Sequence, residues 1–139
     1  MRDWTCYLAG QMTGIDFDSS NVWRETAKEW LESRECNYIV KVINPNDYYN
    51  FITQTYIDNK EIIRFDLHKV RTSDLILVNL NGFSLGTAME LQHAIDNKIP
   101  ILGYKDDGEI LHPWLEYTCD RVFNSLAGAL EYIKVYYLD

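Results

Sequence analysis

The chain has 139 residues, enough for one domain with a buried core, and we expect a single domain over residues 1–139. Its 47% hydrophobic and 24% charged residues are typical of a soluble globular protein. The formal net charge of −8 argues against nucleic-acid polymers and anionic membranes as partners, because both require basic patches. A small anionic ligand stays possible, since a helix N-terminus binds one without any lysine.

Cysteine usage and hydropathy indicate the compartment. The three cysteines are an odd number without CxxC spacing, which indicates a reduced interior and no zinc site. The apolar stretch near the N-terminus is too short for a signal peptide, and no run reaches membrane-spanning length. We therefore expect a cytoplasmic protein that needs neither a metal nor another cofactor.

The hydrophobic pattern predicts strands that alternate with helices. The most distinctive segment, "DLILVNL", is apolar without alternation, which is typical of a strand covered on both faces. "YIVKVINP" is rich in β-branched residues and is ended by Pro45. The predicted strands are 4–10, 38–45, 74–80, 99–104 and 121–124.

Helical periodicity fills the intervals between the strands. The first helix, within 19–35, is expected to begin at Ser19 or Ser20. Its inward residues are expected to be Val22, Trp23, Ala27, Trp30 and Leu31. The second, over about 58–72, is expected to turn Ile62, Phe65 (or Ile63), Leu67 and Val70 inward. Further helices are predicted at 86–97, within 112–120 and at 125–138, and 46–56 has no regular pattern.

This order of elements predicts an α/β fold, a flavodoxin-like doubly wound five-stranded parallel sheet. In such sheets the ligand binds beyond the carboxyl ends of the strands, near the switch point. The segments that follow the first three strands are 9–14, 44–47 and 81–90, and we expect all three to line one crevice. Gly10 and Met12 are therefore candidate substrate-binding residues.

Glu90, expected in the first turn of the helix over 86–97, allows two interpretations. Thr87 and Glu90 match the capping-box pattern, in which the glutamate returns to the helix backbone. The position favours the alternative, because this helix begins where a parallel sheet binds its ligand. A shielded carboxylate there can attack an electrophilic carbon or accept a proton. Ser84, Gly86 and Thr87 are likewise either ordinary cap and turn residues or a binding site for a phosphate or sugar hydroxyl.

Two further side chains carry candidate chemistry. Asp66 shares its helical face with Ile62 and Val70, so it should turn inward, where a carboxylate is costly unless it is paired or functional. Tyr7 lies in a buried strand, and its hydroxyl needs a partner that a nearby carboxylate can supply.

Other polar residues have weaker signals. Asn46 and Asp47, after Pro45, are candidate binding residues, although a plain turn role explains them as well. The three histidines, at positions 68, 93 and 112, show no metal-ligand spacing, and we interpret them as surface or packing residues.

Taken together, "YLAGQMTG", "FDLHKVRTSD", "LILVNL" and "SLGTAMELQHA…KIPILGY" resemble the nucleoside 2-deoxyribosyltransferase family over residues 5–104. The resemblance implies that Glu90 attacks the anomeric carbon of a nucleoside. It also implies that Asp66 contacts or protonates the departing base and that Tyr7 orients the nucleophile. A neighbouring subunit is implied to complete the pocket, so we expect a homo-oligomer, either a dimer or a hexamer.

Position 84 departs from the family pattern. Classical transferases carry an aspartate there, whereas Ser84 is similar to the serine of 2'-deoxynucleoside 5'-monophosphate N-glycosidases that contacts the 5'-phosphate. The serine alone does not decide between transfer and hydrolysis, and from the family resemblance we expect transfer of a deoxyribosyl group between nucleobases. The alternatives are hydrolysis of nucleoside monophosphates and, as a different class, a non-catalytic module that senses a nucleotide.

Overall fold

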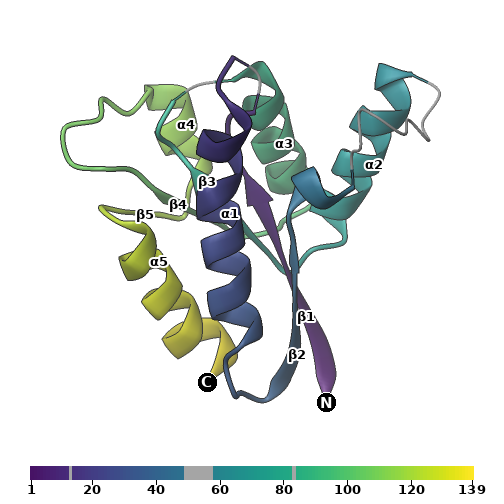
Figure 1. The fold of residues 1–139 in the computed structure, drawn as a ribbon, viewed down its shortest axis with the longest axis vertical. Coiled ribbons are helices and arrows are strands. Elements are labelled where there is room, and N and C mark those ends of the chain that lie inside the picture. The colour runs from purple at the N-terminus through teal and green to yellow at the C-terminus, as the bar shows by residue number, and fades with distance from the viewer. Residues whose placement is uncertain (13, 49–57, 83) are drawn as a thin grey trace.

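A computed structural model describes residues 1–12, 14–48, 58–82 and 84–139 of the chain. One five-stranded sheet forms its centre, in the order β2-β1-β3-β4-β5 with every pair parallel (Figure 1). The strands are β1 Arg2–Ala9, β2 Tyr38–Ile43, β3 Leu75–Asn79, β4 Ile101–Tyr104 and β5 Arg121–Phe123. The α-helices are α1 Phe17–Glu32, α2 Asn59–Arg71, α3 Leu85–Asp96, α4 Pro113–Thr118 and α5 Leu126–Ile133. A 3-10 helix spans Pro45–Asp47, and a π-helical turn, Lys134–Leu138, continues α5.

Two hydrophobic cores lie on the two faces of the sheet. Successive residues of β1 point to opposite faces, so Cys6 and Leu8 belong to one core and Tyr7 and Ala9 to the other. The first core is completed by α1 and α5, and the second by α2, α3 and α4. The four residues Leu75 to Val78 of β3 are all fully buried, because helices cover both faces of the sheet.

The fold confirms the flavodoxin-like doubly wound sheet and each predicted strand. At the switch point, the chain leaves β1 toward one face, through α1, and leaves β3 toward the other, through α3 (Figure 1). The carboxyl ends of β1 and β3 lie side by side, with Ala9 opposite Val78. The loops that follow these two strands therefore meet at one edge of the sheet.

Several details of the helices differ from the sequence prediction. Asp16, and neither Ser19 nor Ser20, is the N-cap of α1, and its side chain accepts a hydrogen bond from the Ser19 N–H at 3.2 Å. Val22 is 62% exposed, because the buried stripe of α1 follows Trp23 and continues at four-residue spacing.

In α2 only Val70 is fully buried, and both Ile63 and Phe65 are exposed. The prediction that Phe65 or Ile63 turns inward is therefore wrong, and Phe65 instead packs against Tyr48. The irregular stretch 46–56 lies mostly outside the described residues. Among the described helices, none combines the length and hydrophobicity that a membrane crossing requires.

Candidate active site

A cavity of about 360 Å³ opens at the carboxyl edge of the sheet, at the junction of β1, α2 and α3. This volume lies within the range of small-molecule sites in proteins. The lining residues are Gly10, Met12, Ile63, Asp66, Leu67, Ser84, Leu85, Gly86, Thr87, Met89 and Glu90. Seven of the ten residues proposed from the sequence are in this set, and an eighth, Tyr7, contacts the set through Glu90.

Glu90 is held by the central strand. The hydroxyl of Tyr7, which is fully buried in β1, donates a hydrogen bond to Glu90 Oε2. The helix that carries Glu90 begins at Leu85, so Glu90 lies in the second turn and the expectation of a first-turn position is wrong. Its side chain is directed at β1 and the cavity, away from the start of its own helix.

The capping-box interpretation is also wrong, because another residue caps the helix. Ser84 is the N-cap of α3, and its Oγ accepts a hydrogen bond from the Thr87 N–H at 3.1 Å. The hydroxyls of Ser84 and Thr87 lie 2.7 Å apart and share a further hydrogen bond. The cap of α3 is therefore formed without a carboxylate, and Glu90 is available to face the cavity.

The environment of Glu90 favours its neutral form. Burial raises the pKa of Glu90 to about 8, and the negative charge of Asp66 contributes in the same direction. The hydrogen bond from Tyr7 and the positive charge of Arg24 lower the pKa but do not outweigh burial. A carboxyl group with a pKa near neutrality is suited to gain or lose a proton during a reaction.

Asp66 brings a second carboxyl group to the same cavity. It is half-buried on α2, and its charge acts on Glu90 across the space between α2 and α3. The inward orientation predicted from helical spacing is thus observed. The cavity holds two carboxyl groups on facing helices, and a pair of carboxyl groups is what most enzymes that cleave glycosidic bonds use.

Arg24 is a member of this neighbourhood that the sequence analysis missed. It is completely buried in α1, and its guanidinium donates hydrogen bonds to the carbonyl oxygens of Leu8, Gly10 and Ser20. Two of these carbonyls belong to the end of β1 and the loop that follows, so Arg24 fixes the backbone beside the cavity. A signal was present in the sequence, because Arg24 precedes the inward residues Ala27 and Leu31 by three and seven positions.

Asn46 and Asp47 lie away from this cavity. The Asn46 amide donates to Asn21 Oδ1 at 3.0 Å, and Asp47 forms an ion pair with Lys28 at 2.9 Å. In the described part of the chain, the segment 44–47 packs against α1 and contributes no residue to the cavity lining. The expected crevice is thus formed from the loops after β1 and β3, with α2 in place of the loop after β2.

The parallel sheet and its strand order define a flavodoxin-like α/β protein, and two carboxyl groups line a cavity at its switch point. The family model of nucleoside 2-deoxyribosyltransferases matches residues 6–125, and the chain belongs to this family.

Solved structures of similar fold include enzymes with related names. The 2-desoxiribosyltransferase of Leishmania mexicana has a TM-score of 0.69 at 19% identity, covering 97% of this chain and 99% of its own. The 2-deoxyribosyltransferase of Bacillus psychrosaccharolyticus has a TM-score of 0.72 at 16% identity, with 92% and 91% covered. The CMP N-glycosidase of Clostridium botulinum has a TM-score of 0.64 at 13% identity, with 95% and 98% covered. At these identities the likeness shows the shared fold. No curated protein sequence matches the chain.

Proposed function

We propose that this protein cleaves the N-glycosidic bond of 2'-deoxynucleosides and transfers the deoxyribosyl group to another nucleobase. The observation that carries the proposal is the placement of Glu90, bound by Tyr7, in a cavity that it shares with Asp66. Membership of the nucleoside 2-deoxyribosyltransferase family supports a nucleoside or nucleotide as the substrate.

The roles follow from the chemistry of glycosidic bonds. The carboxylate of Glu90 attacks C1' while the C1'–N bond breaks, and the electron pair of that bond passes to the departing base. Asp66 in its protonated form donates a proton to the base as it leaves. A second base then attacks C1', releases Glu90 and gives its proton to Asp66. The sugar is thereby transferred and both carboxyl groups return to their starting states.

The raised pKa of Glu90 makes its carboxylate a stronger nucleophile, although only part of the protein carries the carboxylate at neutral pH. With a pKa of about 8, roughly a tenth of the empty protein carries the carboxylate at pH 7. The positive charge that develops on the sugar ring in the transition state attracts this carboxylate and lowers its pKa. Tyr7, which already donates to Oε2, stabilises the anion and sets its orientation.

Hydrolysis of nucleoside 5'-monophosphates is the alternative activity, and the start of α3 favours it. Ser84 places a hydroxyl at the N-terminus of a twelve-residue helix, where backbone N–H groups attract anions. At Gly86 an added Cβ would meet no atom within 4 Å, so the backbone there is open to the cavity. A phosphate group therefore has room at the start of α3. In the hydrolytic reaction, water would attack C1' in place of the second base.

Product analysis separates these activities. The protein is incubated with a 2'-deoxynucleoside and a different free base, and the products are separated by chromatography. A new nucleoside supports transfer, free deoxyribose indicates hydrolysis, and reaction of the 5'-monophosphate alone supports the alternative. If the wild type binds a nucleotide but forms none of these products, a non-catalytic sensing module is indicated, and Glu90→Ala should then leave nucleotide binding intact. In the enzyme hypothesis, Glu90→Ala should abolish turnover.

We also propose that the protein acts as a homo-oligomer, either a dimer or a hexamer. Large apolar side chains at the cavity are open to solvent, with Ile63 50%, Leu85 70% and Met89 55% exposed. Apolar side chains grouped beside a ligand site are suited to contact with a second subunit. Light scattering coupled to size-exclusion chromatography measures the state, and a strictly monomeric mass would contradict the proposal.

A further inference from the structure

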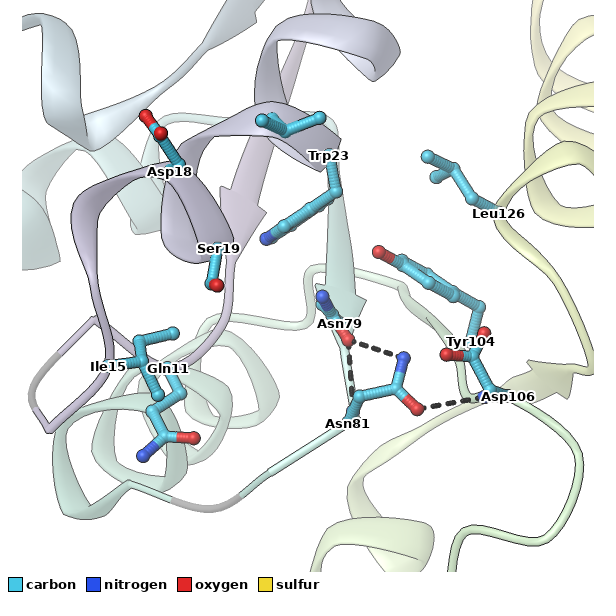
Figure 2. Close-up of a pocket in the computed structure, with 11 residues that line it drawn as sticks. Gln11, Ile15, Asp18, Ser19, Trp23, Asn79, Asn81, Tyr104, Asp106 and Leu126 are labelled. Atoms are coloured by element: carbon cyan, nitrogen blue, oxygen red, sulfur yellow. Dashed lines mark hydrogen bonds between the residues drawn. The ribbon is translucent and has the colours of Figure 1, made fainter.

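A second, larger cavity lies at the same edge of the sheet as the Glu90 cavity but on the opposite face. It measures about 660 Å³ and opens between α1, the ends of β3 and β4, and the start of α5 (Figure 2). The loop after β1 separates the two cavities, because Gly10 and Met12 line the first and Gln11 lines the second. The reaction proposed above makes no use of this second cavity.

Two aromatic rings form a rigid wall of the second cavity. Trp23 and Tyr104 are 9% and 4% exposed, and their rings meet edge to face with centroids 5.8 Å apart. The Trp23 ring is tightly packed, because a Cβ added at Gly10 would lie only 3.0 Å from it. The Arg24 guanidinium lies 4.8 Å from the centre of the same ring. Only a small part of each ring reaches the cavity, so a flat ligand would meet a small but preformed aromatic surface there.

Three hydrogen-bond donors on this wall have no acceptor in the described part of the chain: Trp23 Nε1, the Tyr104 hydroxyl and Asn79 Nδ2. The direction of the Asn79 amide is fixed, because its Oδ1 accepts two hydrogen bonds of 2.9 Å from Asn81. Asn81 is held in turn by the N–H of Asp106, at 2.8 Å. The Asn79 nitrogen must then point away from Asn81, toward the space beside Trp23 (Figure 2).

The edge of the cavity excludes negative charge. Asp18 and Asp106, both exposed, lie among the lining residues, and none of the lining residues that the structure describes is a lysine or arginine. Burial raises the pKa of Tyr104, so its hydroxyl keeps its proton and remains a donor. Nearly buried donors gain most from a ligand that brings acceptors, and the two carboxylates repel an anionic ligand.

We propose that this cavity binds an uncharged planar heterocycle with ring carbonyl groups, such as a pyrimidine base. Its ring packs against Trp23 and Tyr104, and its carbonyl oxygens accept hydrogen bonds from Trp23 Nε1, Tyr104 and Asn79. The site is built from residues on α1, β3 and β4 that take no part in the Glu90 chemistry, so this binding does not depend on the function proposed for Glu90.

Nuclear magnetic resonance of the tryptophan indole groups tests the proposal directly. Protein labelled with ¹⁵N is titrated with uracil, with dihydrouracil, which keeps the carbonyls but is not planar, and with orotate, which adds a carboxylate to the uracil ring. The Trp23 indole resonance, assigned with Trp23→Phe, should shift saturably with uracil, whereas Trp114, 78% exposed on α4, serves as the internal control. Orotate and dihydrouracil should each bind about tenfold more weakly or worse.

Variants connect the response to one cavity. Tyr104→Phe preserves the ring and removes one donor, so it should weaken uracil binding about fivefold while leaving deoxynucleoside turnover unchanged. Gly86 lines the Glu90 cavity, and an added Cβ there would meet no atom within 4 Å. Gly86→Trp places a bulky ring at this cavity, so it should abolish turnover and leave the Trp23 response intact. The proposal is overturned if Trp23 does not respond to uracil, if orotate binds as tightly, or if Gly86→Trp removes the Trp23 response. If the wild type does not turn over deoxynucleosides, that result bears on Glu90 alone, and the Trp23 resonance still reports ligand binding in the second cavity.

Discussion

Tyr7 on the central strand β1 and Glu90 on helix α3 are joined by a hydrogen bond from the phenol to the carboxyl group. The two residues are 83 positions apart in the sequence, and the bond crosses the second hydrophobic core, of which Tyr7 is a fully buried member. A single contact thus connects the sheet to the helix that carries the proposed nucleophile. The same hydrogen bond lowers the pKa of Glu90, against the larger effect of burial.

Removing the Tyr7 hydroxyl should change the pH dependence of the reaction. Tyr7→Phe keeps the ring in the core but removes a hydrogen bond that lowers the pKa of Glu90, so that pKa should rise. We expect kcat/KM to fall by about tenfold to a hundredfold and its rise with pH to move to higher pH. A pH profile of kcat/KM for both proteins provides the measurement. An unchanged profile would show that the phenol does not act on the reacting carboxylate.

The ionisation of Glu90 should also be visible in stability. Its folded-state pKa of about 8 exceeds the ordinary value of 4.5, so the folded state binds more protons than the unfolded state between these values. The free energy of unfolding should therefore fall as pH rises from about 4.5 to 8, with a slope of up to about 1.4 kcal/mol per pH unit from this group. Denaturant unfolding of the wild type and Glu90→Gln across this range tests it, because the variant should lack that part of the slope.

Arg24 should be a major determinant of stability. Arg24→Met leaves the carbonyls of Leu8, Gly10 and Ser20 without their buried donor, and we expect a loss of about 3 kcal/mol or more in the free energy of unfolding. Arg64→Met, at an exposed position of α2, is the matched control and should change stability by less than about 0.5 kcal/mol. Equal effects of the two substitutions in urea denaturation would contradict this role.

Ser84 offers a test that separates the two candidate activities. Ser84→Asp preserves an N-cap acceptor for the Thr87 N–H but adds a negative charge at the helix start. If the phosphate of a monophosphate binds there, this variant should lose activity toward monophosphates by at least about tenfold while retaining activity toward deoxynucleosides.

Ser84→Ala measures the cap itself and should cost about 1 kcal/mol in stability. Ser125→Ala, which removes the equivalent cap of α5, where Ser125 Oγ accepts from the Gly128 N–H at 3.0 Å, is the control and should cost about the same. If Ser84→Asp instead loses activity equally toward monophosphates and deoxynucleosides, the phosphate does not bind at the start of α3.

Much of the fold and of the candidate site could be predicted from the sequence, because the local hydrophobic pattern and the topology of parallel sheets agree. The unbroken apolar run of β3 indicated a strand covered on both faces, and the rule for parallel sheets then placed Glu90 and the loop after β1 at one edge. The need of a buried phenol for a partner pointed from Tyr7 to a carboxylate. Helical spacing was sufficient to turn Asp66 toward the cavity.

What the sequence did not reveal depends on contacts between distant segments. The acceptors of Arg24 are backbone carbonyls at the end of β1 and in α1, and backbone carbonyls carry no sequence signature. Asn46 and Asp47 follow a strand as ligand-binding residues often do, but their side chains form a hydrogen bond and an ion pair with residues of α1. The predicted cap at Thr87 was wrong by three residues, because Ser84 is the N-cap of α3 and accepts the hydrogen bond from the Thr87 N–H.

Covalent capture of the sugar tests the role of Glu90 most directly. The protein is mixed with a 2'-deoxy-2'-fluoro nucleoside, in which the fluorine destabilises the cationic transition state and slows release, and is then digested and analysed by mass spectrometry. We predict a fluorodeoxyribosyl adduct on the side chain of Glu90, absent from Glu90→Ala and discharged when a second base is added. Turnover of deoxynucleosides by Glu90→Ala at the wild-type rate, or an adduct on any other residue, would contradict it.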